Sequence, residues 1–179
     1  DLVNKVKELG MDAVAITDHG TMSGTIEFYK TAKDAGVKPI IGMEAYVAAR
    51  KHTDRDPQKD KGRYHLILLA MNDIGYKNLM KLSIIANLEG MYYKPRIDHD
   101  LLEQYNEGLI VLSGCASSEL GENLRVDNYE EAKNIAKWYK SVFGDRYYLE
   151  LQDHGHLESP TAWDVQVKIN GHLEKIGAE

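Results

Sequence analysis

Apolar residues recur along this chain with two spacings, one typical of strands and one typical of helices. Short apolar runs predict strands of an α/β sheet, where helices cover both faces. Apolar residues spaced by three or four predict helices that pack one side on such a sheet. Strands are expected at residues 13–17, 39–49, 64–71, 108–112 and 147–151. Helices are expected at residues 2–9, 25–35, 73–88, 99–105 and 129–143, and from residue 160 onward.

The alternation of strands and helices predicts an α/β fold with a mostly parallel sheet or barrel. The expected strands suit an incomplete barrel, and an open doubly wound sheet is the alternative. Asp1 opens directly into a helical pattern and Glu179 closes just after another. We therefore expect a fragment of a longer protein.

Two segments between the main elements carry expectations of their own. Ser23 stands where it can cap the helix that begins near residue 25. The expected inner face of that helix carries Ile26, Tyr29 and Ala32. Residues 50–63 hold seven basic side chains when one histidine is counted, and they show no periodicity. This pattern is typical of a mobile surface loop.

Composition excludes several broad classes of protein. With 43% hydrophobic and 28% charged residues among 179, the chain is typical of a globular domain. Its net charge of −6 argues against nucleic-acid binding by overall charge, so any DNA contact needs a local basic patch. The single cysteine, Cys115, excludes an internal disulfide and fits a reducing compartment. No apolar run is long enough to span a membrane, and we expect a cytoplasmic protein.

Metal-capable side chains stand at or near the strand ends. His19 follows the first expected strand, and Asp18 beside it could orient its imidazole. Glu44 lies inside an apolar strand, where a carboxylate is costly unless it is paired or metal-bound. His65 begins the third strand and Cys115 follows the fourth. Together they form a mixed nitrogen, oxygen and sulfur set that suits zinc or another borderline transition metal.

Each of these residues also has an ordinary structural explanation. His19 and Asp18 could cap a turn, Glu44 could lie on the open face of an edge strand, and Cys115 could be a small buried hydrophobe. His65 could be a core histidine with satisfied hydrogen bonds. It also raises a geometric question, because the start of a parallel strand lies far from the site end of a barrel. Either its strand runs antiparallel or the barrel is irregular.

A second candidate contact lies in the connector at residues 92–96. There the cations Lys94 and Arg96 alternate with tyrosines, a pattern that suits phosphate or nucleic-acid contact. A structural connector pinned by its tyrosines is the alternative.

Several motifs, in the order in which they occur along the chain, resemble those of the PHP (polymerase and histidinol phosphatase) domain family. They are Thr17-Asp18-His19-Gly20, Gly42-Met43-Glu44, Tyr64-His65-Leu66, Ser113-Gly114-Cys115 and the run from Leu149 to Gly155. The stretches at residues 38–42, 75–79 and 88–96 are similar to the branch found in bacterial replicative DNA polymerase III alpha subunits. The resemblance covers nearly the whole chain and fades after about residue 158.

The resemblance implies a distorted (β/α)7 TIM-like barrel with a cluster of divalent metal ions, zinc or manganese, at its strand ends. Residues 1–179 would form a single partial domain, incomplete at both ends, without the opening strand and the closing strands. By motif, His19, Glu44, His65 and Cys115 fall on metal-ligand positions. The other ligand positions of the family would lie outside this chain.

The resemblance also implies alternative functions. In DNA replication, the domain would serve as a metal-dependent 3′–5′ exonuclease for proofreading, or as a catalytically reduced brace that docks a separate proofreading subunit. Its partners would be the rest of the polymerase chain and, through it, DNA. A stand-alone metal-dependent phosphatase, such as histidinol phosphatase, is the alternative from the same family.

Overall fold

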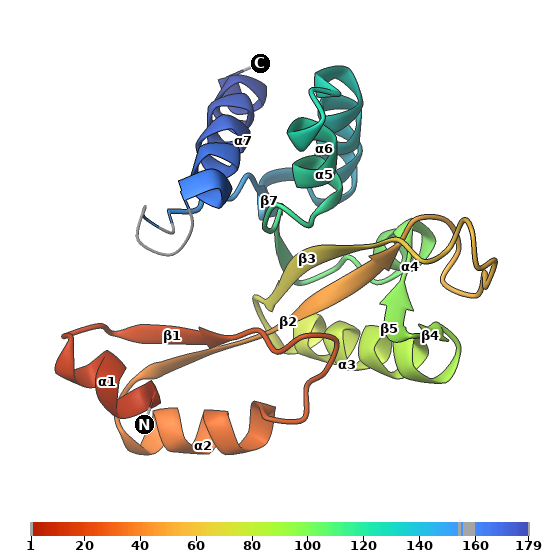
Figure 1. The fold of residues 1–179 in the computed structure, drawn as a ribbon. Helices are drawn as coiled ribbons and strands as arrows, with labels where there is room; N and C mark the ends of the chain where they lie inside the picture. The colour runs from red at the N-terminus through yellow and green to blue at the C-terminus, as the bar shows by residue number, and fades with distance from the viewer. Residues whose placement is uncertain (1, 154, 156–159, 179) are drawn as a thin grey trace.

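A long central strand organises the fold, and helices lie both below and above it in the view of Figure 1. The computed structural model describes residues 2–153, 155 and 160–178. Its helices are α1 (Leu2–Glu8), α2 (Thr25–Asp34), α3 (Asp73–Leu88), α4 (His99–Gln104), α5 (Glu119–Arg125), α6 (Tyr129–Phe143) and α7 (Pro160–Ala178), with a 3-10 turn at Gly144–Arg146. Its strands are β1 (Ala13–Ile16), β2 (Lys38–Ala48), β3 (Arg63–Ala70), β4 (Met91–Tyr92), β5 (Lys94–Ile97), β6 (Leu109–Leu112) and β7 (Tyr147–Tyr148).

The sheet is mixed rather than mostly parallel. Its order is β4-β5-β2-β3-β6-β7, and β1 pairs with β2 outside this path. The pairs β1/β2, β2/β5 and β6/β7 are parallel, whereas β2/β3, β3/β6 and β4/β5 are antiparallel. The antiparallel run of β3 decides the question left open for His65, because the start of β3 then lies beside the end of β2. His65 stands opposite Tyr46 of β2 in this register.

One edge of β2 is shared by two segments that are far apart in sequence. At Glu44, β3 occupies one edge through Ile67, and an isolated parallel bridge brings His19 to the other edge. Farther along, β5 pairs in parallel with Tyr46 and Val47 on that same edge. The turn after β1 and strand β5 therefore lie one after the other along the same edge of β2.

The two faces of the sheet differ in cover. On one face Leu66, Leu68 and Val111 are at most 2% exposed and belong to the main core, with Leu79 and Leu82 of α3. On the other face, the alternate residues of β3 and β6 are only half-buried. Strand β1 is also not covered on both sides, because Ala15 is exposed. The half-covered face is the one that carries Glu44, Tyr46 and His65.

Two expectations about α2 are wrong. Gly24, not Ser23, precedes the helix, and no side chain caps it. The helix buries Phe28 and Ala32 against a small cluster with Val3, Val6 and Val37. Ile26 and Tyr29, expected inside, are 58% and 47% exposed. Phe28 and Ala32 are four residues apart and therefore share one face of the helix, whereas Ile26 lies on the opposite side.

Four short elements were not expected from the sequence: α5, β4, β5 and the 3-10 turn at Gly144–Arg146. The other helices agree with the expected ranges to within a few residues, and Asn72 caps α3 by accepting a hydrogen bond from the Gly75 N–H at 3.0 Å. Among the described residues, no helix is both long and apolar enough to cross a membrane.

Candidate metal centre

Three of the expected ligand residues converge on the half-covered face of the sheet. His19, Glu44 and His65 each offer a donor atom, and these atoms all lie within 4.8 Å of one another. Glu44 joins the two imidazoles: Oε1 lies 2.7 Å from Nδ1 of His65, and Oε2 lies 3.6 Å from Nδ1 of His19. The Glu44 side chain is 15% exposed, so its charge is largely removed from water and requires neighbouring groups, here the two imidazoles, to stabilise it.

Backbone pairing places these residues together. The Gly20 N–H donates to the Glu44 carbonyl at 2.9 Å, and the Glu44 N–H donates to the Asp18 carbonyl at 3.1 Å. Gly20 has φ +67°, and a Cβ on it would lie 2.8 Å from Cγ of Pro95 and 3.0 Å from the Tyr46 ring. Only glycine lets the chain turn this close to β2 and β5.

Cys115 reaches the centre through His65. Its Sγ lies 3.6 Å from Nδ1 of His65 and accepts a hydrogen bond from the Ser117 N–H at 3.4 Å. Gly114 has φ +81°, and a Cβ there would come within 2.9 Å of the His65 carbonyl oxygen. This close turn is what brings the thiol to the imidazole. The thiol lies at the border of the site, since the compact group of three does not include it.

The donor set fits a borderline divalent metal. Ligand atoms bound to one zinc ion lie about 2 Å from it, and therefore within about 4 Å of one another. The observed separations need only small side-chain adjustments to reach that spacing. Two imidazoles, a carboxylate and a neighbouring thiol are also the ligand types that zinc and similar ions accept. The arrangement can hold an ion and offer it to a phosphate ester on the open side, where the His19 side chain is 58% exposed.

Comparison with known proteins identifies the family. The family model described as "PHP domain" matches residues 1–154. The chain belongs to the PHP domain family.

Several curated relatives of this PHP domain carry the same name. DNA polymerase III subunit alpha of Borreliella burgdorferi is 51% identical over 174 residues, which is 97% of this chain and 15% of that protein. The subunits of the same name from Aquifex aeolicus and Thermus aquaticus are 46% and 47% identical over 90% and 98% of this chain. The chain thus spans about 15% of the length of such relatives.

Among solved structures, a protein described as a metal-dependent phosphoesterase from Bifidobacterium adolescentis aligns with 97% of this chain and 77% of its own. The TM-score is 0.48 and the sequence identity 12%, a level at which we draw nothing from the likeness.

Asp18 does not contact the imidazole that it was expected to orient. Its Oδ2 faces the next turn of the PHP domain, where a Cβ on Gly24 would lie 3.0 Å from it. Among the described residues, no hydrogen bond joins the Asp18 carboxylate to His19. Asp18 contributes to the centre through its backbone carbonyl, which fixes the position of Glu44.

Tyr46 belongs to this site, although the sequence did not single it out. Its ring is 5% exposed, and its centroid lies 6.1 Å from that of His19 and 5.4 Å from that of His65. Its spacing of two from Glu44 in a strand was the available signal, because residues i and i+2 share a face. Lys94 is exposed and places its Nζ 5.7 Å from the Tyr46 ring centroid. Of the two cations expected to contact phosphate, Lys94 is therefore beside the centre.

Arg96 is a correction to the sequence analysis, because it is 1% exposed and cannot reach a phosphate in this structure. Its guanidinium donates to the carbonyl oxygens of Gly90, Asp60, His52 and Asp54 at 2.7–3.2 Å. It also lies 5.1 Å from the Tyr92 ring centroid. Burial lowers the pKa of Arg96 from its usual value. Its donors are thus used inside the protein.

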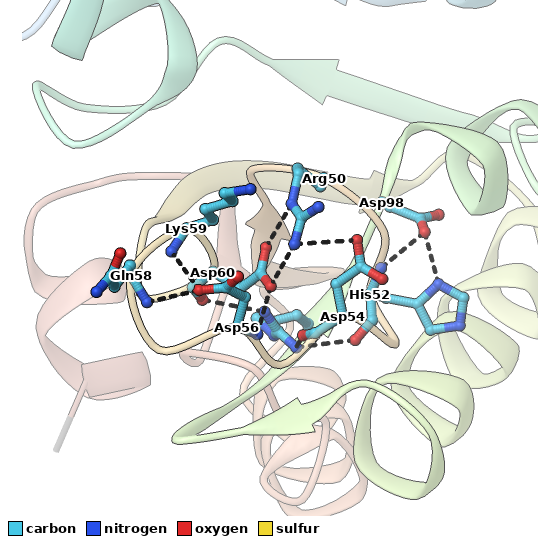
Figure 2. Close-up of polar contacts among 9 residues, drawn as sticks. Arg50, His52, Asp54, Asp56, Gln58, Lys59, Asp60 and Asp98 are labelled. Atoms are coloured by element: carbon cyan, nitrogen blue, oxygen red, sulfur yellow. Dashed lines mark hydrogen bonds and ion pairs between the residues drawn. The ribbon is translucent and has the colours of Figure 1, made fainter.

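Arg96 also explains why the segment expected to be a mobile loop is anchored (Figure 2). Arg50 binds the Asp60 carboxylate with two hydrogen bonds of 2.8 and 2.7 Å, and the Asp56 N–H donates to the same carboxylate at 2.6 Å. Asp60 is 2% exposed, and the hydrogen bond from Arg50 lowers its pKa. The loop folds around Arg96, and these contacts anchor residues for which the sequence had suggested mobility.

Other histidines of the described residues serve other contacts. His52 pairs through Nδ1 with Oδ2 of Asp98 at 2.6 Å. His99 stacks on Trp138 with ring centroids 3.8 Å apart, and its Nε2 lies 2.9 Å from Oε2 of Glu119. His154 and His156, weaker ligand candidates in the sequence, lie outside the described residues.

Proposed function

We propose that this chain is part of a bacterial replicative DNA polymerase III alpha subunit, and that its centre hydrolyses phosphodiester bonds from a 3′ end. The observation that carries the proposal is the convergence of His19, Glu44 and His65 within 4.8 Å. It is supported by the 51% identity to a protein named DNA polymerase III subunit alpha. A replication role would place the protein in the cytoplasm, with the rest of the polymerase chain and DNA as its partners.

In this proposal His19, Glu44, His65 and Cys115 hold zinc or manganese. A bound divalent ion supplies an activated water and stabilises the charge that develops on the leaving oxygen. Glu44 lies between the two imidazoles and keeps both rings oriented, because it contacts each of them. The four residues suit one ion. A larger cluster, and closure of the sheet into a (β/α)7 barrel, would need residues beyond this chain.

Two other functions remain as competing proposals. The domain could be a brace or a docking surface for a proofreading subunit, which the net charge of −6 favours over direct DNA contact. It could also resemble the phosphatases of its family and act on a small phosphate monoester. The identity to polymerase subunits over 97% of the chain favours the polymerase setting over a stand-alone phosphatase.

The test uses the full-length protein with Glu44→Gln, and Glu131→Gln on the exposed side of α6 as the matched control. Glutamine keeps the size of Glu44 but removes the charge that binds metal. We expect metal content, measured by mass spectrometry, to fall and nucleotide release from a single-stranded 3′ end to fall about a hundredfold, as for loss of a group essential to metal chemistry. DNA synthesis should be unchanged.

Other outcomes separate the competing functions. A wild-type protein that binds metal but releases no nucleotides, and loses synthesis or partner binding with Glu44→Gln, would support the brace. Release of phosphate from histidinol phosphate by the wild-type protein would support the phosphatase. Equal metal content in Glu44→Gln and in the Glu131→Gln control would overturn the assignment of Glu44 as a ligand.

A further inference from the structure

We propose that Arg63 and Lys94, arranged around the ring of Tyr46, form a phosphate-binding position beside the metal centre. It would receive a backbone phosphate neighbouring the one at the ion, in a single-stranded nucleic acid. The inference rests on the proposed phosphodiester function and adds a binding position, with Arg63 as a residue that the sequence did not point to.

The two cations approach one ring that already belongs to the centre. Lys94 Nζ lies 5.7 Å and Arg63 Cζ lies 5.8 Å from the Tyr46 ring centroid. The same ring lies 5.4 Å from the His65 ring and 6.1 Å from the His19 ring. Both positive groups therefore lie beside the same aromatic ring as the two imidazoles. Cation–π contact of this kind holds a flexible cationic side chain over a surface without neutralising it.

The ring is fixed by the same backbone that builds the centre. Tyr46 is 5% exposed and packs closely on Gly20, and Pro95 lies close to the same glycine. Lys94 is the first residue of β5, and Arg63 is the first residue of β3, opposite Ala48. The cations thus project from strand ends on either side of β2 rather than from free loops.

Neither cation has an acidic partner among the residues that the structure describes. In the 50–62 loop, by contrast, Arg50 binds Asp60 and Lys51 binds Asp100. Apart from its contact with the Tyr46 ring, Arg63 makes one long hydrogen bond within the described part of the chain, from Nη1 to the Lys61 carbonyl oxygen at 3.4 Å. Two exposed, unpaired cations in a chain of net charge −6 indicate that this position is kept positive for an anion.

An exposed aromatic beside Lys94 favours a polynucleotide over a small phosphate. Tyr93 is 71% exposed and lies at the tip between β4 and β5, with φ +60°. A positive φ is uncommon for a tyrosine and costs conformational energy. Its ring contacts that of Tyr92 with centroids 4.6 Å apart. An exposed ring next to a cation is the combination that binds a base and its phosphate in a single strand.

The expected effect follows from counterion release. Each phosphate contact in a single strand contributes about 0.7 to the slope of log affinity against log salt, which is about fivefold in affinity at 0.1 M salt. Loss of one cation should therefore reduce affinity about fivefold, and loss of both about twenty-five-fold. The salt slope should decrease by about 0.7 for each lost cation.

The test is site-specific photocrosslinking on the full-length protein. Metal is removed by chelation so that no cleavage occurs, and the polymerase site is filled with an excess of hairpin primer–template. A short single strand with a 3′ photoreactive thymidine is titrated, and the crosslink to peptides containing Tyr46, His65 or Tyr93 is quantified at several salt concentrations. The variants are Arg63→Gln, Lys94→Gln and the double variant, with Lys81→Gln on the exposed side of α3 as control. Zinc content after reloading is measured for each.

We expect wild type and Lys81→Gln to crosslink equally, and the other variants to lose affinity and salt slope as stated while zinc content is unchanged. Wild-type crosslinks that are absent from these peptides, or that are unchanged in the double variant, would overturn the inference and leave the metal site standing. Loss of zinc in Arg63→Gln or Lys94→Gln would overturn it in favour of a structural role. Intact crosslinks without nucleotide release from reloaded protein would instead contradict the proposed hydrolysis alone.

Discussion

At the scale of single residues, Asp98 shows how one buried carboxylate ties two segments together. Its Oδ2 accepts a hydrogen bond from the His52 N–H at 2.8 Å and pairs with the His52 ring, and its Oδ1 accepts from the Leu101 N–H at 3.0 Å. Burial acts to raise its pKa, but the hydrogen bonds from His52 and Leu101 outweigh it, and the pKa is lowered. The charged form is therefore favoured by the fold. Its contribution to stability is present above the ordinary carboxyl pKa of about 3.9 and is lost as pH falls through the lower native value.

Asp98→Asn should loosen the loop at pH 6, and the difference from wild type should become smaller as the pH falls below about 3.9. At pH 6 the variant lacks the charge that these hydrogen bonds stabilise, whereas below the ordinary carboxyl pKa the open loop of the wild type gains a proton that the native pairing disfavours, so the advantage of the charged carboxylate declines. Hydrogen exchange of the full-length protein, corrected for intrinsic rates, would follow peptides containing His52 and α4. Asp73→Asn, in the exposed first turn of α3, is the control. An equal difference in exchange between Asp98→Asn and wild type at pH 6 and below about pH 3.9 would contradict the conclusion that the fold favours the charged form of Asp98.

At the scale of elements, the loop at 50–62 depends on an arginine from β5. Arg96→Lys keeps the positive charge but cannot donate to the four carbonyl oxygens that the guanidinium reaches. Buried carbonyls left without donors cost about 1–3 kcal/mol each when no water replaces the donor. We therefore expect the loop to open locally and more often.

Trypsin would report that opening, because the loop contains Lys51, Arg55, Lys59 and Lys61. In the full-length protein, wild type should resist cleavage there and Arg96→Lys should be cleaved at least tenfold faster, since 1.4 kcal/mol changes an opening equilibrium tenfold. Arg125→Lys, at an exposed position of α5, should behave as wild type. Equal cleavage of wild type and Arg96→Lys would show that the arginine does not hold the loop.

The same elements show which parts of the fold the sequence could reveal. Long elements such as α3 and α6 were predictable because apolar spacing over several turns reports which face is buried. Strand β5 was missed because it has four residues, one of them proline, and only its pairing with β2 makes it a strand. The basic composition of the 50–62 loop suggested mobility, but the acceptors that bind Arg96 are backbone carbonyls, which composition does not record.

At the scale of the whole molecule, the residues of the candidate site could be predicted from the sequence, but their positions relative to one another could not. The residues His19, Glu44, His65 and Cys115 could be named from residue type and position relative to the strands. His19 and Cys115 follow β1 and β6, and His65 lies near the start of β3, whereas Glu44 is a carboxylate inside an apolar strand. Their mutual distances depend on the antiparallel run of β3 and on the bridge between His19 and Glu44, both of which are long-range pairings. Arg63 was missed for this reason, because its relation to the site exists only through the register of β2 and β3. Tyr46 could have been found from its spacing of two from Glu44 in the same strand.

Whether the sheet closes into a barrel in the longer protein can be tested on β6. Ile110 lies on the half-covered face, whereas its neighbour Val111 is 0% exposed on the face packed by helices. A charge at a fully buried position costs several kcal/mol, so Val111→Lys should destabilise the domain in either case. In a closed barrel the inner face is filled with side chains, and Ile110→Lys should then be equally harmful.

Thermal unfolding and hydrogen exchange of β6 peptides in the full-length protein would measure the loss of stability in Val111→Lys and in Ile110→Lys. Ile110→Val is a mild control expected to cost about 1 kcal/mol. Tolerance of Ile110→Lys alongside failure of Val111→Lys would mean that this face stays open and that the metal centre is built on a sheet rather than inside a barrel.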